Sequence, residues 1–277
     1  MRYVRFVFEG RKMLGHIDGD GIRVLGEEPI EALLSAGTDL REYTGGAPAG
    51  LIPRDAVSFL PVLERPPKIL CVGLNYAEHT AETRFEQPAY PTIFTRFHTS
   101  LVGQGQPIIC PEASGSLDFE GELAVILKQG GRHITKEDAG ACVAGYALFN
   151  DASVRDYQFL SSQWTMGKNF DATGAFGPEL VTADELPLFA RGLQLETRLN
   201  GTLVQSASTD DMIFDIPCLI SLISEVISLE PGDVIVTGTP SGIGWAREPK
   251  LYMKPGDVCE VSLTGFTTLR NTVAAER

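Results

Sequence analysis

A series of short apolar runs, separated by turn signals, is the feature that most limits the folds open to this chain. Each run is rich in apolar or β-branched residues and has the length of a β-strand. The runs are Lys68–Val72, Leu123–Leu127, Val143–Asn150, Leu193–Leu199, Val234–Thr237 and Val258–Leu263. Strands and helices do not alternate regularly along the chain. The sequence therefore predicts an α+β, β-rich fold and disfavours doubly wound and TIM-barrel folds.

One long helix is predicted, over Asp215–Ser228. Its isoleucines and leucine recur at the spacing of one helical face. Asp215 is suited to the N-cap, and Pro217 lies early in the helix, where proline is tolerated.

Residues 1–64 are predicted to form a small N-terminal β-rich domain. A hairpin signal, Asp18-Gly19-Asp20-Gly21, lies within it, because glycine supplies the positive φ that such turns need. Glu64-Arg65-Pro66-Pro67 follows as an extended connector, since proline fixes φ and restricts the residue before it. We therefore place a domain boundary there, with residues 65–277 as the larger domain.

The overall charge argues against nucleic acid as a partner. The chain has 23 Lys and Arg against 36 Asp and Glu, a net charge of −13, whereas a phosphate-binding surface needs clustered basic residues. The most apolar stretch, Ile213–Leu229, carries two acids and a proline, so no membrane span is predicted. The five cysteines lack paired spacing, and no signal-peptide core is visible. These features predict a cytoplasmic protein with reduced thiols.

Two glutamates stand at the start of an apolar strand. Glu120 and Glu122 would point to the same face, because side chains alternate along a strand, and Asp151 ends another apolar run. Hard oxygen ligands favour Mg²⁺, Mn²⁺ or Ca²⁺, and the four histidines lie too far apart in the chain for a zinc site. The alternative is a solvated strand face with salt-bridge partners.

Two further clusters carry chemistry. Asp151, Arg155 and Gln158 would share one face if the segment is helical, which is also typical of a plain polar helix surface. Lys168 follows a glycine and suits a loop that lines a pocket, although it could equally be a surface lysine. His79 and Glu82 are three residues apart, so one helical turn lets the carboxylate hold the imidazole as a general base, or as a merely structural pair.

Five motifs follow one another in a fixed order along the chain. They are Asn75-Tyr76-x-x-His79-x-x-Glu82, Phe119-Glu120-Gly121-Glu122, Asn150-Asp151-x-x-x-Arg155-Asp156-x-Gln158, Gly167-Lys168 and Gly238-Thr239-Pro240-Ser241-Gly242. Taken together and in this order, they resemble the fumarylacetoacetate hydrolase superfamily. The resemblance covers roughly Pro67 to the end of the chain and points to the branch of bacterial acylpyruvases and 2-hydroxyhepta-2,4-diene-1,7-dioate isomerases.

The resemblance implies a fold, a metal and a set of roles. The larger domain would be a mixed β-sandwich or roll, paired into a homodimer, with Mg²⁺ or Mn²⁺ as cofactor and a small anionic 2-oxo or diketo acid as substrate. The implied metal ligands are Glu120, Glu122 and Asp151; the implied catalytic residues are His79, Glu82 and Lys168; and the implied substrate-binding residues are Arg155, Gln158 and Thr239.

The implied reaction is hydrolysis of a C–C bond in an acylpyruvate or 2,4-diketo acid, with the His79–Glu82 dyad activating water. The same enolate chemistry serves two alternatives, a decarboxylase of oxaloacetate-like β-keto acids and an isomerase or tautomerase. A non-catalytic metal-binding protein is the third reading. The chain departs from many relatives around Arg96, which would bind either the substrate or a neighbouring acid, and residues 83–90 are a candidate lid.

Overall fold

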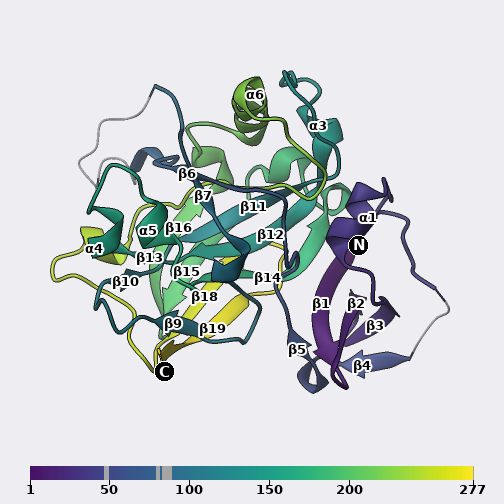
Figure 1. Ribbon diagram of the computed structural model, residues 1–277, viewed down its shortest axis with the longest axis horizontal. Helices are drawn as coiled ribbons and strands as arrows, with labels where there is room; N and C mark the ends of the chain where they lie inside the picture. Colours follow the sequence, from purple (N-terminus) through teal and green to yellow (C-terminus); the bar gives the residue numbers. More distant parts are fainter. Residues whose placement is uncertain (47–49, 79–81, 83–88, 277) are drawn as a thin grey trace.

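The computed structural model describes residues 1–46, 50–78, 82 and 89–276. A large mixed sheet runs through the molecule, with strand order β4-β3-β2-β1-β14-β12-β11-β17-β6-β7, β5 pairing with β1 and β8 with β14 (Figure 1). Its strands are β1 (Arg2–Phe8), β2 (Arg11–Asp18), β3 (Gly21–Gly26), β4 (Leu51–Pro53), β5 (Ser58–Phe59), β6 (Ile69–Gly73), β7 (Thr92–Arg96), β8 (Leu101–Val102), β11 (Gly121–Leu127), β12 (Val143–Asp151), β14 (Gly174–Thr182) and β17 (Val234–Val236).

A second sheet packs across the first. Its order is β16-β15-β18-β19-β9, and β10 pairs with β13 beside it. These strands are β9 (Ile108–Cys110), β10 (Leu117–Asp118), β13 (Ser153–Val154), β15 (Gln194–Leu199), β16 (Thr202–Ser208), β18 (Val258–Leu263) and β19 (Leu269–Ala275). Leu123 of the first sheet and Leu195 and Val261 of the second lie in one buried core. The predicted β-rich α+β sandwich is confirmed.

Helices are few and mostly short within the described ranges. The predicted long helix is α6 (Ile216–Val226), whose N-cap carboxylate, on Asp215, accepts the backbone N–H of Cys218 at 3.0 Å. It ends before the predicted Ser228 because Ile227 is extended. The others are α1 (Ile30–Ser35), α3 (Ala139–Cys142), α4 (Arg155–Gln158), α5 (Thr165–Lys168) and the 3-10 turns η1 (Arg54–Ala56), η2 (His98–Ser100), η3 (Ala183–Glu185), η4 (Leu188–Ala190), η5 (Thr209–Asp211) and η6 (Gly244–Ala246). Across the described ranges no helix is both long and apolar enough to traverse a membrane.

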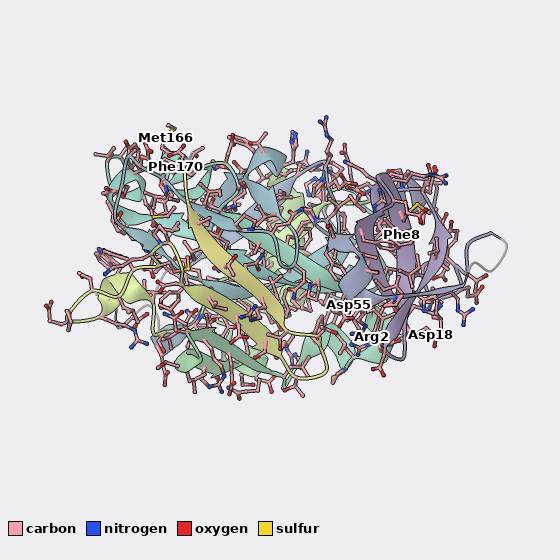
Figure 2. The ribbon with its side chains drawn as sticks, turned by 90° about the horizontal axis from the view of Figure 1, so that it is seen from below. Arg2, Phe8, Asp18, Asp55, Met166 and Phe170 are labelled. Atoms are coloured by element: carbon pink, nitrogen blue, oxygen red, sulfur yellow. The ribbon has the colours of Figure 1, made fainter. Side chains whose placement is uncertain are left out.

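The N-terminal strands continue the large sheet. The predicted turn is present, since Asp18 pairs with Gly21, and another tight turn joins Phe8 to its partner Arg11. β1 also pairs with β14, where Tyr3 lies opposite Leu180. Figure 2 shows Phe8 and Asp18 of these strands at the opposite end of the view from Met166 of α5. The division of the chain near residue 64 stays a prediction.

The pairing of β11 with β12 creates the start of the site. Gly121 lies opposite Asn150, and the backbone N–H of Asp151 donates to the carbonyl oxygen of Glu120 at 2.9 Å. Asp151 therefore ends a strand. The prediction that it shares a helical face with Arg155 and Gln158 is wrong, because β13 separates it from α4, which begins only at Arg155.

Candidate metal and substrate site

Three buried carboxylates converge where β11 and β12 meet. Glu120, Glu122 and Asp151 each offer an oxygen atom, and these atoms lie within 4.8 Å of one another. All three residues are at most 5% exposed. The predicted acidic cluster is thus a buried group that could hold a metal ion, not a solvated strand face.

Cationic side chains surround two of these acids. The Nζ atom of Lys168 lies 2.6 Å from Glu120 and 2.7 Å from Asp151. Glu120 also meets a guanidinium nitrogen of Arg155 at 2.7 Å, and Asp151 meets one of Arg96 at 2.5 Å. Such ion pairs offset the cost of burying the charges.

Glu122 is in a different position. Its carboxylate accepts the backbone N–H of Gly238 at 2.6 Å. No described cation forms an ion pair with this carboxylate. Burial raises the pKa of Glu122 well above its usual range, and the charges of Asp151 and Glu120 raise it further. A buried set of hard oxygen donors with this excess of negative charge fits a hard divalent cation.

Lys168 is held in the site by close packing of two short helices. Gly167 of α5 lies against α4, where a Cβ atom would meet the backbone nitrogen of Gln158 at 2.4 Å. The glycine that precedes Lys168 is therefore needed for this approach. Burial alone lowers the pKa of Lys168, but Asp151 and Glu120 outweigh it and raise that pKa. The side chain is an ammonium ion, with its Nζ atom 4.8 Å from the centre of the Phe94 ring.

Arg155 has one unused donor atom that faces no described acceptor. Its Nε atom donates to Asp118 at 2.8 Å, and Nη1 donates to the side-chain oxygen of Gln158 at 2.8 Å. Its Nη2 atom is buried and has no hydrogen-bond partner among the described residues. Arg155 and Gln158 both line the cavity, so the guanidinium that carries this unpaired donor borders it.

Asp118 is a functional residue that the sequence analysis missed. It is fully buried and accepts the N–H of Gly244 and of Trp245, each at 2.8 Å, in addition to Arg155. It thus fixes both the cavity-lining guanidinium of Arg155 and the loop that carries Trp245. The signal available in the sequence was its place next to Phe119 and Glu120.

Changing Asp118 to asparagine should therefore destabilise the protein. Both carboxylate oxygens accept hydrogen bonds from N–H groups, so an amide NH₂ in either orientation faces a donor. Arg155 also loses one of its two charged partners and keeps only Glu120. We expect a loss of about 3–5 kcal/mol in the free energy of unfolding, measured in urea. Asp171→Asn, at an exposed carboxylate, is the control and should stay within about 0.5 kcal/mol. An Asp118→Asn variant as stable as this control would contradict the assigned role.

Thr239 lies on the loop that follows β17 and lines the cavity. Its hydroxyl donates to the carbonyl oxygen of Gly121 at 3.0 Å and accepts from the Gln205 amide at 2.8 Å. Gln205, also missed in the sequence, accepts the N–H of Gly121 as well. The side chain of Thr239 therefore anchors the loop to β11.

The other predicted residues have different outcomes. Arg96 is buried and is not among the residues that line the cavity. Its guanidinium contacts Asp151, Thr173 and Ser100. These contacts favour the prediction that Arg96 binds a neighbouring acid. His79 and positions 83–88 of the predicted lid lie outside the described residues. Glu82 accepts the N–H of Gly242 at 2.8 Å, beside the loop of Thr239. The His79–Glu82 dyad stays a prediction.

The cavity lining combines polar and aromatic side chains. Its polar members are Glu120, Glu122, Arg155, Gln158, Lys168 and Thr239. Four aromatic side chains, Phe94, Phe159, Trp164 and Trp245, and several aliphatic residues complete the described lining. We call these four residues the aromatic wall.

This fold and site define a class of β-rich proteins that gather three carboxylates, an ammonium and a guanidinium beside one cavity. Residues 68–274 match the family model described as fumarylacetoacetate (FAA) hydrolase C-terminal, and the chain belongs to this family.

Relatives of the chain carry several activities. The chain is 42% identical, over 78% of its length and 69% of the relative's, to the mitochondrial oxaloacetate tautomerase Fahd2a of Rattus norvegicus. The structure of 2-hydroxyhepta-2,4-diene-1,7-dioate isomerase from Mycobacterium marinum is similar over 100% of this chain and 99% of that one, with a TM-score of 0.80 and 30% identity. Maleylpyruvate hydrolase from Sphingobium sp. SYK-6, solved with manganese(II) and pyruvate, is similar over all of both chains, with a TM-score of 0.84 and 28% identity. The isomerase-like branch named from the sequence is confirmed.

Proposed function

We propose that the protein is a divalent-metal-dependent enzyme that interconverts the keto and enol forms of a small 2-oxo acid. The observation that supports this proposal is the cluster of three carboxylates, Glu120, Glu122 and Asp151, with Lys168 and Arg155 beside it. All of these residues except Asp151 line one cavity. Enolisation places negative charge on the 2-oxo oxygen, and preorganised cations are the groups that stabilise such charge.

Each residue has a distinct part in this proposal. The free Nη2 atom of Arg155, with the neighbouring Gln158, binds the substrate carboxylate. An ammonium has three N–H donors, and Lys168 uses two on Glu120 and Asp151, so the third can donate to the 2-oxo oxygen. Mg²⁺ or Mn²⁺, held by the three carboxylates, would supply Lewis acidity toward the same oxygen.

Tautomerisation moves one proton from C3 to the 2-oxo oxygen and needs no second reactant. The C3–H bond breaks, its electron pair forms the C2–C3 double bond, and the carbonyl pair moves onto the oxygen, which takes a proton. Reversal returns the proton to C3. From the sequence we expect His79, supported by Glu82, to accept the C3 proton.

The similarity to an oxaloacetate tautomerase at 42% identity favours tautomerisation as the overall reaction. Hydrolysis is the second candidate, favoured by the likeness to a maleylpyruvate hydrolase. In that reaction R–CO–CH₂–CO–COO⁻ and water give R–COO⁻, pyruvate and a proton. Water adds to C4, the C3–C4 bond breaks, and its electron pair remains on C3 until a proton arrives.

Proton exchange in D₂O tests the proposal directly. With Mg²⁺ or Mn²⁺, we expect the protein to accelerate loss of the C3 proton signal of pyruvate, oxaloacetate, 4-methyl-2-oxopentanoate or phenylpyruvate by at least about 100-fold over the metal-free protein. The exchange is followed by proton NMR. EDTA should abolish the acceleration, and added Mg²⁺ should restore it.

Two outcomes separate the candidates. Acetate formed from acetylpyruvate, detected by mass spectrometry, would show hydrolysis, whereas exchange without cleavage would show tautomerisation. Exchange of none of the four 2-oxo acids, or exchange that EDTA leaves unchanged, would contradict the proposed function.

A further inference from the structure

We propose that the preferred substrate carries only one carboxylate. At the end opposite this carboxylate it carries an apolar group, preferably an aromatic ring. This inference rests on the proposed function and names the substrate class of the same site. It separates this chain from the dicarboxylic acids named in its relatives, oxaloacetate and 2-hydroxyhepta-2,4-diene-1,7-dioate.

The described cations of the cavity provide for a single anionic group. Among the described residues that line it, Arg155 and Lys168 are the cationic ones. Lys168 is occupied by Glu120 and Asp151, and Arg155 by Asp118, Glu120 and Gln158. The Nη2 atom of Arg155 remains for a first carboxylate, and the described lining holds no further cation for a second one.

Much of the remaining lining is aromatic. Phe159 and Trp245 lie with ring centres 5.0 Å apart, and Phe94 and Trp164 with ring centres 5.4 Å apart. The aromatic wall brings no formal positive charge to a second carboxylate, whereas it packs favourably against an alkyl chain or another ring.

The wall is built into the fold. Trp164 packs against Gly73 at the end of β6, where a Cβ atom would meet the indole carbon Cζ3 at 2.4 Å. The backbone of Trp245 donates to the buried carboxylate of Asp118, which also holds Arg155. The anion-binding guanidinium and one side of the aromatic wall are thus fixed by the same residue.

A matched pair of 2-oxo acids tests this inference. In 4-methyl-2-oxopentanoate an isopropyl group replaces the second carboxylate of oxaloacetate with little change in size, and phenylpyruvate places a ring there. We expect kcat/KM for metal-dependent proton exchange, each divided by the uncatalysed rate, to be at least about 30-fold higher for these two acids than for oxaloacetate. Each methylene added to a straight-chain 2-oxo acid should raise kcat/KM about threefold to fourfold until the wall is filled.

A variant shifts the preference in the opposite direction. Phe159 is 40% exposed at the cavity rim, so Phe159→Arg introduces a cation into the wall without burying it. We expect the ratio of kcat/KM for oxaloacetate to that for 4-methyl-2-oxopentanoate to rise at least about tenfold. Val226→Arg is the control and should leave this ratio unchanged. Val226 is 69% exposed and ends α6, at the top of Figure 1, whereas Phe159 directly follows α4, at the left.

The outcomes distinguish the two proposals. Two results would overturn the single-carboxylate inference and leave the proposed function standing. One is a wild-type protein that prefers oxaloacetate. The other is a ratio of kcat/KM for oxaloacetate to that for 4-methyl-2-oxopentanoate that is the same in Phe159→Arg as in Val226→Arg. Absence of metal-dependent exchange with every acid overturns the proposed function and this inference with it.

Discussion

Replacing Glu122 by glutamine should stabilise the metal-free protein and abolish its metal-dependent activity. Glu122 is buried, and its ionised form is opposed by the charges of Asp151 and Glu120. Glutamine keeps an oxygen that can accept the N–H of Gly238 but removes the charge. We expect the free energy of unfolding of the metal-free variant to rise by about 1–2 kcal/mol.

The same change removes a ligand from the candidate metal site. We expect kcat/KM for proton exchange to fall at least about 1,000-fold and the increase in Tm on adding Mg²⁺ to disappear. Urea unfolding in EDTA and a thermal scan with and without Mg²⁺ measure both effects. Glu225→Gln, at an exposed glutamate of α6, should change neither. A destabilised, metal-responsive Glu122→Gln variant would show that Glu122 is a structural acid and not a metal ligand.

The acidic cluster was accessible from the sequence because its geometry is local. Glu120 and Glu122 stand two residues apart at the start of one strand, and Asp151 ends the neighbouring strand along the chain. Once β11 and β12 pair with Gly121 opposite Asn150, the three carboxylates have to meet. Period-two alternation and the ends of apolar runs contain this information.

Asp118, Gln205 and the aromatic wall were not accessible in this way. Asp118 matters because it accepts the N–H of Gly244 and Trp245, more than a hundred residues away along the chain. Gln205 matters because it joins Thr239 to Gly121. Nothing in the local pattern of either residue shows its partner, since their roles arise only when the two sheets pack together.

The described contacts also explain why the site needs so many cations. Arg96 and Lys168 both meet Asp151, while Arg155 and Lys168 both meet Glu120. Lys168 is therefore the bridge between the two acids. Because a divalent cation would be attracted to the same carboxylates, the ammonium and the metal share one set of negative charges.

Replacing Lys168 by methionine should separate the contribution of Lys168 to stability from its contribution to catalysis. Methionine is similar in length but leaves Glu120 and Asp151 with one cation each. We expect the metal-free variant to lose about 3–5 kcal/mol of unfolding free energy. Mg²⁺ should restore part of that loss, by about 2.7 kcal/mol when its concentration is a hundred times its dissociation constant.

Activity should not follow stability in this variant. The N–H donor aimed at the 2-oxo oxygen is gone, so kcat for proton exchange should stay about 100-fold to 1,000-fold below that of the wild type at saturating Mg²⁺. The rise in Tm on adding Mg²⁺ should be larger in Lys168→Met than in the wild type, whereas it should disappear in Glu122→Gln. The control Lys254→Met, at an exposed lysine, should behave as the wild type does. If Mg²⁺ instead restored full exchange to Lys168→Met, Lys168 would be a counter-ion of the acids alone, and the proton would have to reach the substrate oxygen from another group.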